Sequence, residues 1–199
     1  MHLDSPTQKQ SRRSALALSA HTYLKGKQMH LALDLHNYPL STEETALITE
    51  ECVRQGDAGP DANKALTEAY ITAQLTAQLW HVDSHDAVTA DELETLIFDL
   101  IAKIKYGTVI RYRTTSVRFA NFTFAINAAN VPNAMQSYCE AFVEKRLDTA
   151  DEAYRLFEEI HPFNDGNGRV GWLLWCLHHV VQGEAWPIAS APDLFSQNS

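Results

Sequence analysis

The sequence lacks the features that mark several large classes of protein. It contains only three cysteines, Cys52, Cys139 and Cys176, an odd number without a CxxC pair, which argues against a disulfide framework or a zinc ribbon. No uninterrupted apolar run approaches the ~18 residues of a membrane-spanning helix. With 8 Gly, 7 Pro and no low-complexity tract, no linker divides the 199 residues. We therefore expect a single domain over 1–199 in the reducing cytoplasm, without membrane contact.

Basic residues are also scarce. The 16 Lys and Arg against 25 Asp and Glu give a net charge of −9, which argues against non-specific binding to nucleic acid. The acidic residues nevertheless avoid one stretch, because residues 101–135 contain no Asp or Glu. That stretch holds the basic residues Lys103, Lys105, Arg111, Arg113 and Arg118. A basic stretch in an acidic chain favours contact with an anion.

Helical periodicity dominates the chain and predicts a mainly α fold. Apolar residues recur at helical spacing over 61–80, 90–104, 131–142, 148–160 and about 168–183, and Thr89 with Glu92 forms a capping box before the second of these. β-branched and aromatic residues are dense only over 108–126, which favours one β-hairpin with a turn at 120–121. Because one hairpin among six to eight helices cannot form a sheet core, the helices must form the core.

The densest group of functional residue types is the string HPFNDGNGR at 161–169. Gly166 and Gly168 permit backbone conformations that expose successive N–H groups, and the helix expected after them points its positive end at the same place. These features favour an anion site, and phosphate is a common occupant of such sites.

The polar side chains of the same string extend this interpretation. Asp165 suits a divalent cation that bridges phosphate oxygens, and Arg169 can clamp a phosphate. His161 can accept a proton at neutral pH. Each residue alone has an ordinary structural explanation, but their combination within nine residues favours phosphoryl or nucleotidyl transfer to a hydroxyl.

The string resembles the Fic family signature HPFx[D/E]GNGRxxR. The resemblance extends upstream, where 107–113 and the hairpin resemble the flap of that family and 156–160 resembles the stretch before the motif. It implies a Fic-type helical fold with N-terminal helices at 1–104, a core at 105–185, a flap at about 108–126, a motif loop at 161–169 and a C-terminal tail at 186–199.

The resemblance implies a protein adenylyltransferase, in which a Ser, Thr or Tyr hydroxyl of a target protein attacks the α-phosphate of ATP and pyrophosphate leaves. His161 would be the catalytic base and Asp165 the Mg²⁺ ligand. The nucleotide and phosphate would be bound by Phe163, Gly166, Asn167, Gly168 and Arg169, of which Phe163 is also interpreted as the buried anchor of the loop. The target protein would dock on the flap through Thr115, Ser116, Val117, Phe122, Thr123 and Phe124.

The sequence departs from the signature at its last position, where Trp172 replaces a second Arg that contacts the distal phosphates in the family. Three interpretations stay open. The loss of one cation would weaken the use of ATP, or Trp172 would stack on the base of another donor such as UTP or CDP-choline, or it would be a core residue of an almost entirely apolar helix. A phosphorylating enzyme and a non-catalytic binding module are the alternative functions.

The inhibitory motif [S/T]xxxE[G/N] of the family is also missing, since Glu43, Glu44, Glu50, Glu51 and Glu184 lack a Ser or Thr four residues earlier. If inhibition occurs, the resemblance implies a separate antitoxin-like partner protein. A family of toxins and effectors also implies delivery into a host cell as an alternative to a cytoplasmic location.

Overall fold

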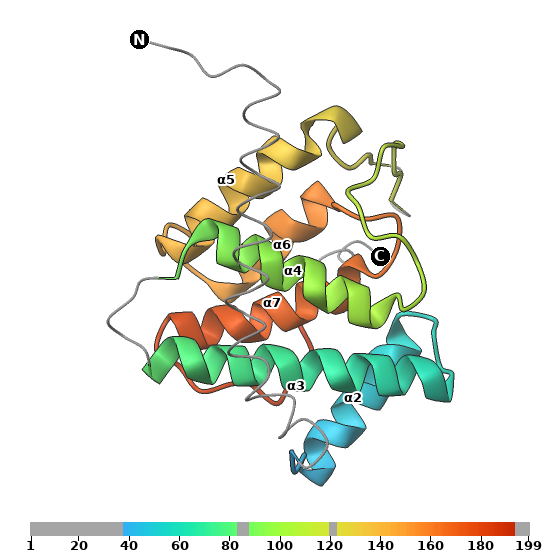
Figure 1. Ribbon diagram of the computed structural model, residues 1–199, viewed down its shortest axis with the longest axis vertical. Coiled ribbons are helices and arrows are strands. Elements are labelled where there is room, and N and C mark those ends of the chain that lie inside the picture. The colour runs from blue at the N-terminus through green and yellow to red at the C-terminus, as the bar shows by residue number, and fades with distance from the viewer. Residues whose placement is uncertain (1–37, 83–87, 120–122, 194–199) are drawn as a thin grey trace. The chain divides into compact units, whose positions relative to one another are not determined.

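The computed structural model describes residues 38–82, 88–119 and 123–193 (Figure 1). The chain divides into two units, Met1–Tyr38 and Pro39–Ser199, and all described residues except Tyr38 belong to the second. The described residues are mainly helical, as the sequence predicts. Their elements are α2 (Thr42–Arg54), α3 (Pro60–Val82), α4 (Ala90–Ile104), the short 3-10 helix η1 (Ala128–Asn130), α5 (Val131–Val143), α6 (Ala150–Ile160) and α7 (Asn167–Val181).

Reciprocal side-chain caps determine where two of the helices begin. At α4 the N–H of Glu92 donates to Thr89 Oγ1 at 3.2 Å, and the N–H of Thr89 donates to Glu92 Oε2 at 2.8 Å, which confirms the predicted capping box. Ser41 and Glu44 make the same exchange before α2. Each box satisfies two backbone N–H groups that a helix start would otherwise leave unpaired.

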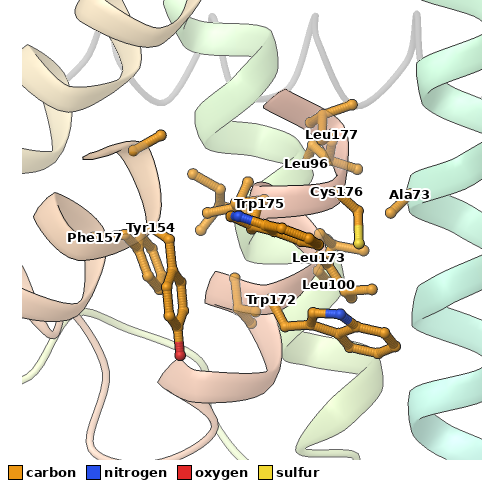
Figure 2. Close-up of a cluster of buried hydrophobic side chains, with 14 of the residues drawn as sticks. Ala73, Leu96, Leu100, Tyr154, Phe157, Trp172, Leu173, Trp175, Cys176 and Leu177 are labelled. Carbon is orange, nitrogen blue, oxygen red and sulfur yellow. The ribbon is translucent and has the colours of Figure 1, made fainter. Parts of the chain in front are cut away.

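Helix α7 lies at the centre of the packed helices. It contacts α6, α3 and α4, and Figure 2 shows its side chains between Ala73 of α3 and Phe157 of α6. Seven of its side chains are completely buried: Val170, Trp172, Leu173, Leu174, Cys176, Leu177 and His178. A helix that is apolar on every face must be covered on every face, and the surrounding helices do this. The loop before α7 is therefore attached to the buried centre of the fold.

The predicted flap hairpin is formed only in part. Arg118 and Phe124 make one antiparallel bridge, and the N–H of Phe119 donates to Thr123 O at 2.8 Å. Over the described residues 108–119 and 123–126 there is no strand, and the predicted turn and Phe122 lie outside the described residues. The Arg113 guanidinium lies in the same segment and donates to the carbonyls of Thr115 and Ile126.

The three cysteines are free and buried, so the expectation that they form no disulfide is confirmed. Among the helices of the described residues, none combines the length and the apolar character needed to cross a membrane. The division into a single domain with a C-terminal tail stays a prediction.

Candidate active site

The motif loop joins α6 to α7, and left-handed backbone occurs at both of its ends. His161 has φ 48° at the end of α6, where its N–H donates to Phe157 O at 2.9 Å. Gly166 has φ 84° immediately before α7. A Cβ on Gly166 would lie 2.6 Å from Ile101 Cδ1, so both the backbone conformation and the close approach of α4 require glycine there.

The Asn167 side chain closes the middle of the loop. Its Oδ1 accepts from the N–H of Phe163 at 2.9 Å, and its Nδ2 donates to the carbonyl of Phe163 at 2.8 Å. The Phe163 ring is buried, stacked on Tyr112 and edge-to-face with Phe98. Both polar groups of Phe163 are thus engaged inside the loop, so its part in the site is that of an anchor.

The start of α7 is built to receive an anion. Gly166 precedes the helix without a side-chain cap, so the first backbone N–H groups of α7 have no side-chain acceptor at that position. The positive end of a 15-residue helix points in the same direction. The N–H of Gly166 itself donates to Asp165 Oδ1 at 2.6 Å. Of the residues predicted to bind phosphate, Asn167 and Gly168 are therefore the two whose backbone N–H groups lie at the uncapped start of α7.

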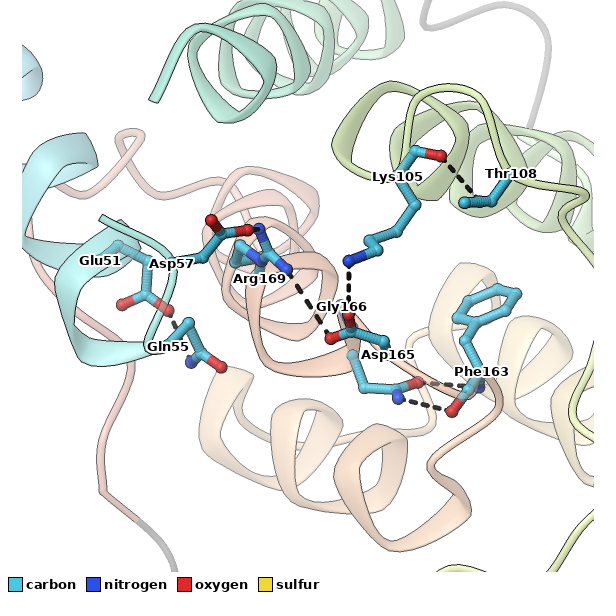
Figure 3. A network of polar contacts seen from close by, with 10 residues as sticks. Glu51, Gln55, Asp57, Lys105, Thr108, Phe163, Asp165, Gly166 and Arg169 are labelled. Carbon is cyan, nitrogen blue, oxygen red and sulfur yellow. Dashed lines mark hydrogen bonds and ion pairs between the residues drawn. The ribbon is translucent and has the colours of Figure 1, made fainter. Parts of the chain in front are cut away.

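Arg169 lies one turn into α7, and its side chain is only 3% exposed. Its Nη1 donates to Asp57 Oδ2 at 3.0 Å, and its Nη2 lies 3.8 Å from Asp165 Oδ1 (Figure 3). Its Nε is buried without a hydrogen-bond partner. Two carboxylates thus hold the guanidinium beside the loop.

Cationic side chains from two helices approach the Asp165 carboxylate. Lys105, at the end of α4, donates to Asp165 Oδ2, while Arg169 approaches from α7. Burial alone would raise the pKa of Asp165, but the Lys105 ammonium, the Gly166 N–H and the Arg169 charge outweigh it and hold the pKa below its ordinary value. The carboxylate is therefore ionised at neutral pH.

A divalent cation would find one ionised carboxylate at this position. The Asp165 side chain is 62% exposed, and Mg²⁺ commonly binds through one or two carboxylates together with substrate phosphates. Within the described part of the chain, no group of three or more His, Cys, Asp or Glu is placed to hold a metal ion. The residues present therefore fit a cation that arrives with a phosphate ligand, and Asp165 is the residue that would hold it.

The end of α2 forms a wall beside the loop. A Cβ on Gly168 would lie 2.5 Å from both the nitrogen and the oxygen of the Gln55 side-chain amide. Gln55 Nε2 donates to Glu51 Oε1 at 2.9 Å, and Arg54 pairs with the same buried carboxylate. A side chain at position 168 would therefore have to displace the Gln55 amide, which is the far end of a flexible side chain.

The backbone of His161 is held in an unfavourable conformation. A residue before proline avoids the helical regions and a non-glycine residue rarely has positive φ, yet His161 precedes Pro162 with φ 48°. Arg113 stabilises this backbone conformation by two hydrogen bonds. Its side-chain Nε donates to His161 O at 2.7 Å, and its backbone N–H donates to Pro162 O at 2.9 Å. Arg113 therefore holds the backbone of His161, from which the imidazole extends.

The imidazole of His161 lies between an aromatic ring and a carboxylate. Phe119 of the flap meets it edge-to-face with ring centroids 5.3 Å apart, and Nδ1 lies 3.6 Å from Glu158 Oε2. The side chain is 21% exposed. The ring is thus fixed on two sides and still reachable, as a base for an incoming hydroxyl requires.

The residues predicted to dock a target protein are mostly on the surface. Thr115, Ser116 and Thr123 are exposed, Phe124 is 67% exposed and Val117 is half-buried, whereas Phe122 lies outside the described residues. An exposed Phe beside exposed hydroxyls is compatible with docking, which stays a prediction.

Trp172 is a core residue. Its side chain is fully buried, its ring packs on Tyr70 with centroids 5.6 Å apart, and Nε1 donates to Ala189 O at 2.9 Å. Of the three interpretations left open by the sequence, the structure supports the core residue, because a completely buried ring cannot stack on a base.

Comparison with known protein families gives a match over part of the chain. Residues 87–178 match the Fic/DOC family. The match covers just under half of the chain and includes the whole of α4, the flap, the motif loop and most of α7.

Among solved structures, a Fic family protein from Desulfovibrio desulfuricans G20 resembles the chain with 19% sequence identity and a TM-score of 0.40. The resemblance covers 91% of this chain and 58% of that protein, so the chain spans little more than half of that protein's length. None of the curated proteins matches this chain.

Three polar residues at the site were not identified from the sequence. Lys105 belongs to the stretch 101–135, whose lack of acidic residues favours contact with an anion. Nothing in the sequence indicates that Lys105 contacts Asp165, 60 positions away. Asp57 lies in a Gly-rich segment that suggested only a loop. Glu158 lies three positions before His161 on α6, so helical spacing was the available signal for their proximity.

We expect Arg113→Lys to destabilise the fold by about 3 kcal/mol or more, because a lysine cannot replace a planar guanidinium that donates to four backbone carbonyls. Those carbonyls belong to Thr115, Ile126, Ile160 and His161. Urea unfolding measures the effect, with Arg111→Lys as the exposed control on the same segment. Equal unfolding midpoints for the two variants would contradict the role given to Arg113.

Proposed function

We propose that the protein is an adenylyltransferase that transfers AMP from Mg²⁺-ATP to a hydroxyl of a target protein. The observation that carries the proposal is the arrangement around the motif loop within the Fic/DOC match. There a reachable His161, the uncapped start of α7, an ionised Asp165 and the cations Arg169 and Lys105 lie together.

In the proposed step the hydroxyl gives its proton to His161. The oxygen of the hydroxyl forms a bond to the α-phosphorus of ATP, the bond from that phosphorus to pyrophosphate breaks, and the proton on His161 returns to solvent. The N–H groups at the start of α7 hold the phosphates through the positive end of the helix. A magnesium ion bound to Asp165 would supply charge neutralisation on the phosphate oxygens.

The flap would present the target protein to His161. Phe119 contacts the imidazole from the flap, and the exposed Phe124 is paired with Arg118 across the antiparallel bridge. A target segment held at these residues therefore lies near the base. The absence of acidic residues from 101–135 favours a target segment that is itself acidic.

Lys105 completes the phosphate site in this proposal. Trp172 supplies no second cation from α7, whereas Lys105 Nζ already contacts the carboxylate next to the expected phosphates. We expect Lys105→Met to weaken ATP binding about tenfold, the effect of losing one charge-assisted contact. Calorimetry of ATP binding measures it, with Lys103→Met, which removes the Asp99 pair on the same helix, as the control. Equal affinities of the two variants would show that Lys105 has no such role.

Radiolabelled ATP tests the proposed function. The protein is incubated in a lysate with ATP that carries the label in the α-phosphate or, separately, in the γ-phosphate. Transfer of the α-label alone is expected. Transfer of the γ-label would indicate phosphorylation, and label from UTP or CDP-choline but not from ATP would indicate another donor. If no donor labels any protein, a non-catalytic module that binds nucleotide or a partner protein without turnover replaces the proposal.

A further inference from the structure

We propose that Glu158 is a positioning residue for His161. It holds the imidazole with the proton on Nδ1, which leaves the lone pair of Nε2 for the acceptor hydroxyl. The inference rests on the proposed function for the identity of that hydroxyl, but the tautomer that it assigns does not depend on any transfer reaction.

The first observation is the burial of Glu158. The residue is 5% exposed, and its Oε1 has no hydrogen-bond partner. Within the described part of the chain, His161 is the one basic residue recorded within 4.0 Å of this carboxylate. Burial of a carboxylate without a partner costs free energy. The position of Glu158 beside His161 therefore indicates that the two side chains are partners.

The second observation concerns the imidazole. The atom that faces Glu158 is Nδ1, which is itself buried without a hydrogen-bond partner. The 3.6 Å between Nδ1 and Oε2 is longer than a hydrogen bond. Catalytic hydrogen bonds are often long in a ligand-free site and tighten when substrate binds, and a shift of about half an ångström would suffice here.

A third observation is the space that α7 leaves for the carboxylate. Gly171 lies inside α7, where glycine costs about 1 kcal/mol relative to alanine. A Cβ on Gly171 would lie 2.6 Å from Glu158 Oε1 and 2.8 Å from Tyr154 Cε2. The glycine therefore makes room for the Glu158 carboxylate between α6 and α7, on the side of α6 that leads to His161.

The chemical consequence follows from the two nitrogens of imidazole. A carboxylate that accepts from Nδ1–H selects one tautomer, fixes the orientation of the ring and stabilises the imidazolium formed when Nε2 takes the hydroxyl proton. Without the carboxylate, part of the population carries the proton on Nε2 and cannot act as a base there. Glu158 thus acts through His161 and does not touch the substrate.

The test compares Glu158→Leu with Glu159→Leu, which removes the exposed carboxylate of the next residue. Long-range ¹H–¹⁵N NMR of the ring nitrogens identifies the His161 tautomer, and steady-state transfer gives kcat and KM. In the wild type and in Glu159→Leu we expect the proton on Nδ1. In Glu158→Leu we expect mixed tautomers and a kcat lower by about 10- to 100-fold, with KM unchanged.

Glu158→Gln provides a second variant in case the leucine variant does not fold, and because it keeps an acceptor oxygen we expect a smaller loss of kcat. A wild-type His161 that carries its proton on Nε2 overturns the inference, and so do Glu158 variants whose tautomer and kcat equal those of Glu159→Leu. If the wild type transfers nothing, the proposed function fails, while the tautomer comparison still decides the role of Glu158.

Discussion

His161→Ala should lower the rate of AMP transfer by about 10²- to 10⁴-fold, the usual contribution of a general base. The reason is geometric, since His161 is the reachable imidazole beside the start of α7 and its ring is held by Phe119 and Glu158. Binding of ATP should change little, because the phosphate contacts come from α7 and from the cations. The measurement is α-label transfer at saturating ATP, together with calorimetry of ATP binding.

The control for this variant is His179→Ala, which removes a histidine in the last turn of α7. Both variants should unfold at urea concentrations close to that of the wild type. If His161→Ala transfers label as fast as His179→Ala, the base lies elsewhere and the proposed step is wrong.

Trp172→Arg restores the family signature. We expect this substitution to unfold the protein instead of improving its binding of ATP. The substitution replaces a fully buried ring, whose Nε1 donates to the carbonyl of Ala189, with a charged side chain. Loss of a buried Trp alone costs about 3–5 kcal/mol, and an unpaired buried charge adds several more. Their sum approaches or exceeds the stability of an ordinary domain, about 5–15 kcal/mol. Circular dichroism and urea unfolding measure the loss.

Trp80→Arg is the matched control, because it makes the same substitution at a half-buried Trp on α3. We expect a much smaller loss there. A Trp172→Arg variant that folds like the control and binds ATP more tightly would show that position 172 faces the nucleotide and not the core.

The sequence predicts those parts of the molecule that depend on local pattern. The capping box at Thr89, the helix after Gly166 and the anchoring of Phe163 follow from spacing and residue type, and the structure has all three. The predicted flap hairpin has only one antiparallel bridge in its described part, and no local pattern indicates that Arg113 donates to the carbonyls of Thr115 and Ile126.

The side chains that complete the site could not be predicted, because they come from distant elements. Asp57 reaches Arg169 across 112 positions, and Lys105 reaches Asp165 across 60. Such contacts depend on how α2 and α4 pack against α7, and no local pattern contains that information. The same packing brings distant side chains against two glycines, since a Cβ on Gly168 would lie 2.5 Å from the Gln55 amide and one on Gly171 would lie 2.6 Å from Glu158 Oε1.

Mass spectrometry of a modified target peptide tests the central claim most directly. A target protein captured from α-labelled lysate is digested, and the labelled peptide is fragmented to find the mass and position of the adduct. We expect a mass increase equal to one AMP residue, on a Ser, Thr or Tyr hydroxyl, that disappears with His161→Ala. An adduct equal to a phosphate, or an AMP adduct that persists without His161, would contradict the proposed function.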